Sequence, residues 1–172
     1  MTISALAGTA GLLLFPLAMC YAALMDLTTL KIRNALVLAI AGGWVVLAPL
    51  AGFTLAELGA SLSVAGAVLV LTFVFFALGW IGGGDAKLAA ATALWFEPQQ
   101  ALVYFTYASL LGGLLTLLIL QMRSRWMPAS FYRVPWIARL NEPKGGVPYG
   151  AAMAPAALIV FPNTEWVAHA VF

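Results

Sequence analysis

The sequence predicts an all-α, polytopic integral membrane protein with about six transmembrane helices. Of its 172 residues, 64% are hydrophobic and only 8% are charged, and the mean hydropathy is +1.02. Soluble domains carry about 25% charged residues, so a soluble domain of this size could not bury so much apolar surface. Disorder is excluded as well, because it requires low hydrophobicity and high charge. We expect one transmembrane domain over residues 1–172.

Uncharged stretches mark the expected spans. A helix crosses the hydrocarbon core with about 20 mainly apolar residues. Five stretches meet this requirement: residues 1–25, Ala35–Ala56, Leu58–Gly84, Pro98–Met122 and Gly145–Thr164. Leu88–Phe96 is apolar but shorter, and it crosses only if it borrows Gly82–Lys87. If it re-enters the membrane instead, the protein has five spans.

The distribution of charge decides between these two counts, because cytoplasmic loops collect Lys and Arg. With six spans and the first running from outside to inside, every basic residue falls on the cytoplasmic face: Lys31, Arg33, Lys87, Arg123, Arg125, Arg133, Arg139 and Lys144. Glu57, Glu97 and Glu165 then fall outside. Five spans would divide the basic residues between the faces. We therefore predict six spans, with both termini on the outer (periplasmic) side.

Two aspartates lie at the cytoplasmic boundary in this topology. Asp26 directly follows the first apolar span, and Asp85 ends the third behind Gly82, Gly83 and Gly84. An ionisable group at the edge of a span is a functional-site hypothesis. Two carboxylates that meet tend to hold one proton between them, which suits acid–base chemistry on water and a carbonyl group. Alternatively, each aspartate marks a helix end at the interface.

The glycines before Asp85 strengthen the functional interpretation. They carry no Cβ atom, so an extended peptide could approach the carboxylate, or backbone N–H groups could bind it. The alternative is helix packing, because Gly79 and Gly83 form the small-xxx-small spacing that is common between membrane helices.

Three segments together resemble one family. Gly82-Gly83-Gly84-Asp85-Ala86-Lys87 resembles the G-x-G-D-x-K motif of type IV prepilin leader peptidases, which are aspartic peptidases of the inner membrane. Asp26 to Asn34 is similar to that family's first-aspartate motif, in which an Ile-Pro-Asn element follows the aspartate; Arg33 replaces the proline. Val147-Pro148-Tyr149-Gly150, followed by Ala154-Pro155-Ala156, is similar to the family's late segment at the start of the last span.

The resemblance implies a role for each matching residue. Asp26 and Asp85 would form the catalytic dyad that activates water, with no metal and no cofactor. Further residues would bind substrate or shape the site: Gly82, Gly84, Lys87, Asn34, Pro148, Tyr149 and Gly150. For Lys87 the alternative is snorkelling to the interface, and for Asn34 it is capping of the second span. One cysteine, Cys20, and one histidine, His169, leave little for a metal site.

The resemblance also implies the substrate and its location. The substrate would be a prepilin or pseudopilin, cut where a short polar leader meets an apolar helix, at the cytoplasmic face of the bacterial inner membrane. The length and the single cysteine are similar to the short, peptidase-only form of tight-adherence (Flp) pilus systems.

A basic and aromatic loop covers about residues 123–144 and includes Trp126, Phe131, Tyr132 and Trp136. We expect it to anchor on the anionic inner leaflet, with substrate docking as the alternative and no binding of nucleic acid.

Two other functions remain open at this point. Presenilin-like intramembrane peptidases share a G-x-G-D element, although their first aspartate lies within a span. A small transporter or membrane assembly subunit could use Asp26 and Asp85 as proton or ion ligands.

Overall fold

The computed structural model describes residues 2–124, 133–143 and 145–171. Throughout this part of the chain the regular secondary structure is helical, without strands, as the sequence predicted. The α-helices are α1 (Ile3–Thr29), α2 (Asn34–Ala51), α3 (Leu55–Ala77), α4 (Gly83–Ala93), α5 (Pro98–Ser124), α6 (Pro135–Leu140), α7 (Gly150–Val160) and α8 (Glu165–Val171). A 3-10 helix, Phe161–Asn163, joins α7 to α8.

The length of α1, α2, α3 and α5 suits a membrane. Each is long and apolar enough to cross one. Their outer faces expose large apolar side chains such as Leu13, Leu38, Val70 and Leu117, which match lipid and would be unfavourable in water. With 11 residues each, α4 and α7 are about 16 Å long, roughly half the thickness of the hydrocarbon core. The chain is a membrane protein, and the count of six spans stays a prediction.

The third expected span, Leu58–Gly84, has different limits in the structure. Helix α3 begins earlier, because Thr54 and Glu57 form a capping box: the Thr54 N–H donates to Glu57 Oε2 at 2.7 Å and the Glu57 N–H to Thr54 Oγ1 at 3.3 Å. The helix ends at Ala77, and Gly79 adopts a φ of +74° in the turn that follows. Gly79 and Gly83 therefore do not share a helix, so the small-xxx-small interpretation was wrong.

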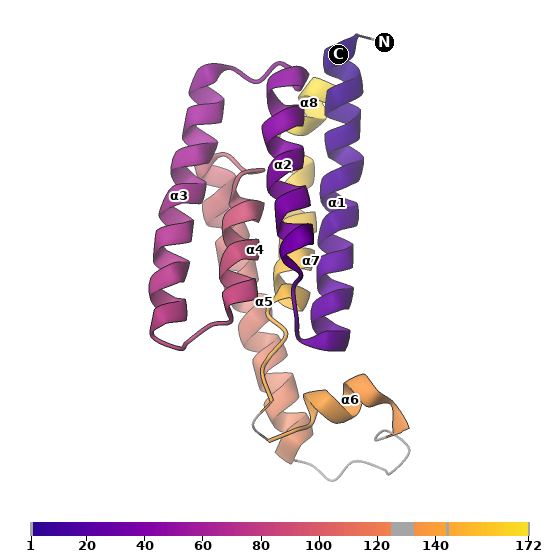
Figure 1. Ribbon diagram of the computed structural model, residues 1–172. Helices are drawn as coiled ribbons and strands as arrows, with labels where there is room; N and C mark the ends of the chain where they lie inside the picture. Colours follow the sequence, from indigo (N-terminus) through magenta and orange to yellow (C-terminus); the bar gives the residue numbers. More distant parts are fainter. Residues whose placement is uncertain (1, 125–132, 144, 172) are drawn as a thin grey trace.

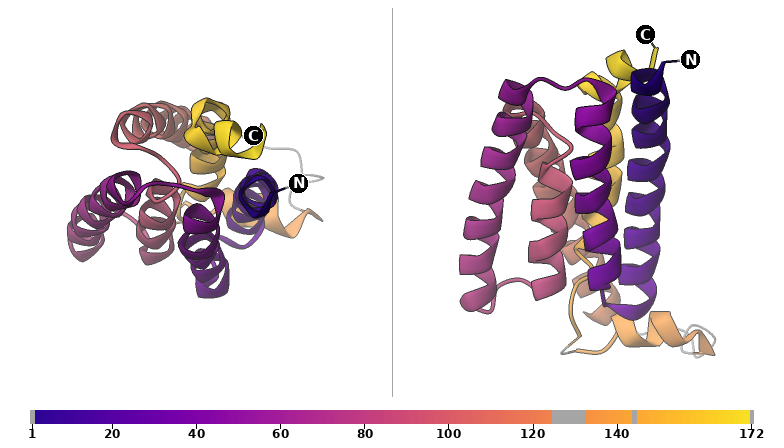
Figure 2. Two further views of the ribbon diagram at one scale, coloured as in Figure 1. Left: turned by 90° about the horizontal axis from the view of Figure 1, so that it is seen from above. Right: turned by 45° about the horizontal axis from the view of Figure 1, so that its top comes forward.

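The helices α1, α2, α3, α4, α5 and α7 run roughly parallel to one long axis, whereas α6 lies across one end of the bundle (Figure 1). Seen from above in Figure 2, α4 lies between α3 and α2, while α7 packs against α1 and α5. The N- and C-termini lie at the same end, and α6 lies at the other (Figure 1). Both termini thus lie at one end of the bundle, and which side of the membrane this end faces stays a prediction.

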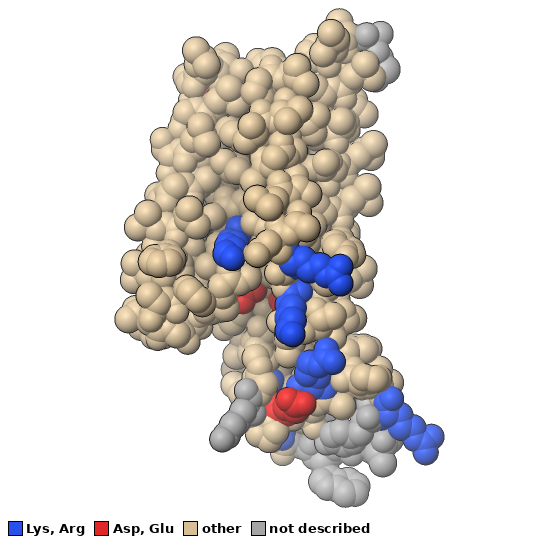
Figure 3. Space-filling view, viewed as in Figure 1, with Lys and Arg blue, Asp and Glu red and all other residues tan. Residues whose placement is uncertain are grey.

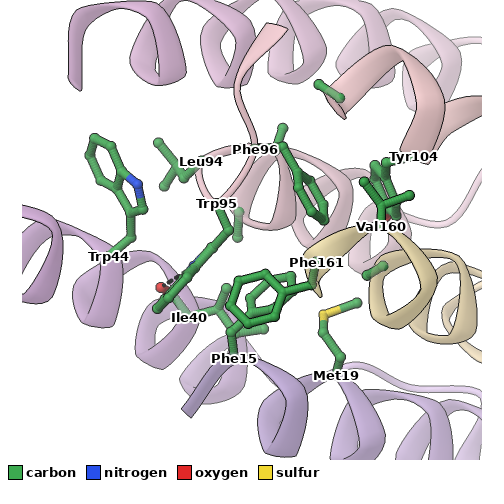
Figure 4. Close-up of a cluster of buried hydrophobic side chains, with 14 of the residues drawn as sticks. Phe15, Met19, Ile40, Trp44, Leu94, Trp95, Phe96, Tyr104, Val160 and Phe161 are labelled. Carbon is green, nitrogen blue, oxygen red and sulfur yellow. Dashed lines mark hydrogen bonds between the residues drawn. The ribbon is translucent and has the colours of Figure 1, made fainter. Parts of the chain in front are cut away.

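An aromatic cluster fixes the helices to one another in the half that contains the termini (Figure 4). The chain leaves α4 at Leu94 and inserts Trp95, which is 1% exposed, between α1 and the C-terminal helices. Its ring stacks on Phe15 at 4.9 Å and on Trp166 at 4.5 Å, measured between ring centroids. Its indole N–H donates to the Ile40 carbonyl oxygen at 3.1 Å. These contacts connect α1, α2 and α4 to one another. They thereby help to position the opposite ends of α1 and α4, which carry Asp26 and Asp85.

Candidate active site

Asp26 lies in the last turn of α1 and faces the first turn of α7. Its side chain is buried, with 4% exposed. The Gly150 N–H donates to Asp26 Oδ2 at 2.7 Å. The N-terminus of a helix attracts negative charge, because its first N–H groups have no partner within the helix. Helix α7 therefore provides a binding site for this carboxylate.

Asp85 begins a helix instead of ending one, which corrects the expectation from the sequence. The chain turns after α3, Gly82 forms the N-cap of α4, and Asp85 stands in the first turn. A Cβ atom on Gly82 would lie 2.9 Å from Asp85 Oδ2, closer than van der Waals contact allows. Glycine at position 82 therefore leaves the room that this side chain occupies.

The two aspartates border the same cavities. One cavity of about 350 Å³ and another of about 340 Å³ share Asp26, Leu30, Gly82 and Asp85 among their lining residues. The two carboxyl groups are close enough to interact electrostatically. In Figure 3 acidic atoms are visible in a hollow in the lower part of the molecule, with basic side chains around it. The structure thus brings together two carboxyl groups that are 59 positions apart in the sequence.

The late segment, residues 147–150, lies beside this pair. Pro148 is fully buried, and Tyr149 lines the cavity of about 340 Å³ together with both aspartates. A Cβ atom on Gly150 would lie 2.9 Å from Asp26 Oδ2 and 3.1 Å from Ile32 Cδ1. Gly150 is therefore a close-contact position, and the structure places all three predicted residues of this segment at or beside the cavities.

Several residues of the cavities, among them Ile32 and Leu30, were not singled out from the sequence. Ile32 packs against both glycine segments: a Cβ atom on Gly84 would lie 3.2 Å from Ile32 Cβ. Its position in the Asp26–Asn34 motif was the available signal. Leu30 has a left-handed backbone with a φ of +53°, and its N–H donates to the Asp26 carbonyl oxygen at 2.8 Å. Nothing in the sequence indicated this conformation, which a leucine rarely adopts.

Lys87 and Asn34 meet outside these two cavities. The Lys87 ammonium group donates to Asn34 Oδ1 at 3.2 Å. Asn34 does not cap α2 with its side chain, so that alternative was wrong: the N-cap is Arg33, which makes no side-chain capping bond. Lys87 lines an apolar groove between α2, α3 and α4. These two residues are thus neighbours of the aspartate cavities and do not line them.

Arginines fasten the loop before α7. Arg123 at the end of α5 donates from Nε to the Leu140 carbonyl oxygen at 2.8 Å and from Nη2 to that of Gly146 at 3.0 Å. Arg139 on α6 donates to the carbonyl oxygen of Thr28, two residues after Asp26. These hydrogen bonds connect the loop to the end of α5 and to the end of α1 that carries Asp26. Of the other residues expected to anchor this loop, the structure describes Arg133 and Trp136. The rest lie outside the described residues: Arg125, Trp126, Phe131, Tyr132 and Lys144.

Comparison with known protein families finds a match. The model of the type IV leader peptidase family matches residues 13–117, which is more than half of the chain. The matched region includes Asp26, Gly82, Gly84 and Asp85 and ends before Gly150. No curated protein and no solved structure matches the chain. A match of this extent indicates a leader-peptidase function, and the chain belongs to the type IV leader peptidase family.

Proposed function

We propose that the protein is an aspartic endopeptidase whose catalytic groups are Asp26 and Asp85. The observation that carries this proposal is that the carboxyl groups of Asp26 on α1 and Asp85 on α4 both line the same two cavities. Two carboxyl groups that interact electrostatically in a shared cavity do not ionise together readily, so the pair holds one proton between them. One ionised and one protonated carboxyl group are the acid and base that hydrolysis of an amide by water requires.

The reaction then needs no covalent intermediate. The ionised carboxylate takes a proton from water, and the water oxygen attacks the carbonyl carbon of the scissile peptide bond. The protonated carboxyl group donates a hydrogen bond to the carbonyl oxygen. When the C–N bond breaks, the proton taken from water passes to the leaving nitrogen, so the dyad returns to its starting state. The N-terminus of α7 would hold Asp26 in position during these steps.

We propose a prepilin or pseudopilin as the substrate. Family membership implies prepilin-type substrates. Lys31 lines one of the aspartate cavities, and Figure 3 shows basic side chains around the acidic ones, which supports a location at the cytoplasmic face of the bacterial inner membrane. A substrate places its scissile peptide bond at this membrane boundary if a short polar leader precedes the bond and an apolar helix follows it.

Leader removal by the pure protein tests the proposal. The full chain is purified in detergent and incubated with a synthetic prepilin-type peptide, in which a polar leader ends in glycine and an apolar helix follows. The intact mass of the peptide should fall by the mass of the leader alone, with no other cleavage product. A matched peptide with valine in place of that glycine should be cut far more slowly. If the wild-type protein leaves several such peptides uncut, or instead dissipates a proton gradient in vesicles, the proposal is wrong and transport becomes the better account.

A further inference from the structure

The segment that leads into Gly150 has little secondary structure of its own. Residues 145–148 form no helix, and their backbone hydrogen bonds within the described part of the chain are local, such as that from the Gly145 N–H to the Glu142 carbonyl oxygen at 2.9 Å. Gly150 then begins α7 and donates the hydrogen bond to Asp26. The position of this donor therefore depends on the contacts that fix the segment to the neighbouring helices.

Arg123 provides such contacts from the last turn of α5. Its Nε donates to the carbonyl oxygen of Leu140, the last residue of α6, and its Nη2 donates to that of Gly146. A Cβ atom on Gly145 would lie 3.0 Å from Nη2, so the guanidinium group lies directly against this backbone. Because the guanidinium group is planar and rigid, it holds two acceptors at a fixed spacing. Arg123 therefore fixes both the end of α6 and the start of the segment relative to α5.

Arg139 connects the same region to α1. Its Nη1 donates to the carbonyl oxygen of Thr28, in the last turn of the helix that carries Asp26. The last carbonyl groups of a helix lack partners within it and carry partial negative charge, so they bind a guanidinium group favourably. Arg139 directly precedes Leu140, which Arg123 holds. The two arginines thus link α5, α6 and α1 in series, and the Gly150–Asp26 bond joins α7 to the same end of α1.

The arginines act at a distance from the reacting groups. Neither of them lines the aspartate cavities. Gly146, however, accepts the hydrogen bond from Arg123 and lines the cavity of about 340 Å³ together with both aspartates. A displacement of Gly146 is therefore expected to move one wall of this cavity and, four residues later, the donor to Asp26. A shift of about 1 Å in the geometry of a catalytic site can cost about 100-fold in rate.

We propose that Arg123 and Arg139 are positioning residues of the aspartate pair, which keep the N-terminus of α7 in hydrogen-bonding contact with Asp26. This inference rests on the proposed function. Both guanidinium groups donate to carbonyl groups of the protein. Arg133 of the same loop differs in this respect, because it is exposed and its side chain makes no hydrogen bond to the described residues. Since the two arginines do not contact the substrate, their loss lowers kcat and leaves KM nearly unchanged.

A spectroscopic measurement tests the inference directly, because Asp26 and Asp85 are the only aspartates in the sequence. The full chain with Asp85→Asn is made by cell-free synthesis with aspartate that carries carbon-13 in its side-chain carboxyl group, so that Asp26 holds the single label. The resonance of this carbon responds to hydrogen bonding and to protonation of the carboxyl group. We expect Arg123→Gln and Arg139→Gln to shift the resonance at a fixed pH, and Arg133→Gln, the matched control, to leave it in place.

An unshifted resonance in Arg123→Gln, in a protein with the wild-type helix content, would overturn the inference. If Arg123→Gln does not fold, Arg123→Lys takes its place. Lysine keeps the positive charge, but its ammonium group lacks the rigid fork that reaches both carbonyl oxygens. A shifted resonance in this variant supports the inference, and an unshifted one overturns it.

Kinetics in the chain with both aspartates measure the consequence for hydrolysis. Arg123→Gln should lower kcat for the synthetic prepilin-type peptide at least about tenfold, with KM within about twofold of the wild-type value. Arg133→Gln should change neither constant. A higher KM with an unchanged kcat would assign Arg123 to substrate binding and overturn the inference.

This inference and the proposed function fail in different ways. If the wild-type chain cleaves the peptide but Arg123→Gln keeps its kcat, the arginines do not position the aspartate pair, and the peptidase proposal stands. If the wild-type chain cleaves no such peptide, the proposed function is wrong. The resonance of Asp26 still shows in that case whether Arg123 holds the N-terminus of α7 on this carboxyl group.

Discussion

The contact between Gly150 and Asp26 allows a sharp prediction for Gly150→Ala. The added methyl carbon would lie 2.9 Å from Asp26 Oδ2 and 3.1 Å from Asp26 Cβ. Non-bonded carbon atoms prefer about 3.5–4.0 Å, so the two segments must move apart. The hydrogen bond of 2.7 Å from the Gly150 N–H to Asp26 then lengthens or breaks. A hydrogen bond to a charged group contributes about 1.5–3 kcal/mol. At about 1.4 kcal/mol per tenfold, kcat/KM for leader removal should fall roughly 10- to 150-fold.

The assay for this variant measures initial rates of leader removal by intact mass, with the amount of membrane-inserted protein determined in parallel. Gly113→Ala is the matched control, because its added methyl group meets nothing within 4 Å. It should keep the wild-type rate. A Gly150→Ala protein that is present at normal levels and cleaves at nearly the wild-type rate would refute the idea that the N-terminus of α7 positions Asp26.

Three further predictions concern the loop, the topology and metal independence. Gly145→Ala should lower the melting temperature and slow cleavage several-fold, because its methyl group would lie 3.0 Å from Arg123 Nη2. In Gly146→Ala the added methyl group meets nothing within 4 Å, so a thermal unfolding assay should show an unchanged melting temperature. Reporter fusions after Arg33 should indicate the cytoplasm and fusions after Glu97 the outside; a cytoplasmic signal at Glu97 would contradict the six-span topology. EDTA should not affect leader removal, since the chain has one cysteine and one histidine, and activity that is lost with EDTA and restored by zinc would exclude a metal-free mechanism.

Much of the fold followed from the sequence, because uncharged stretches of sufficient length form helices in lipid. The long helices α1, α2 and α5 coincide closely with expected spans, and α3 covers most of a fourth. The ends of the elements could not be predicted as well. Glycine at position 79 permits a turn with positive φ, but whether a helix ends there depends on how α4 packs against α3, which is a tertiary effect. For this reason Asp85 was expected at the end of a span, and it is found at the start of α4.

The candidate site was predictable in its residues and not in its contacts. Motif resemblance singled out Asp26, Asp85 and Gly150, and the model brings these three together. The bond from the Gly150 N–H to Asp26 could not be inferred, because it joins residues 124 positions apart and depends on the packing of α7 on α1. The pairing of Lys87 with Asn34 was missed for the same reason: side chains of adjacent helices meet in ways that local sequence does not specify.

Replacement of the two aspartates is the most direct measurement of the central claim. Asp26→Asn and Asp85→Asn keep the shape of the side chains but remove the negative charge and the exchangeable proton, and they add no buried charge, so protein levels should change little. Each single variant should lose nearly all leader removal, as measured by intact mass of a synthetic prepilin-type peptide. The double variant should be hardly worse than either single one, because the two groups act as a unit. Glu142→Gln, two residues after α6 and outside the aspartate cavities, is the control and should cleave normally. If either single variant, present in the membrane at the normal level, still removes the leader at nearly the wild-type rate, the aspartic dyad is not the catalytic centre.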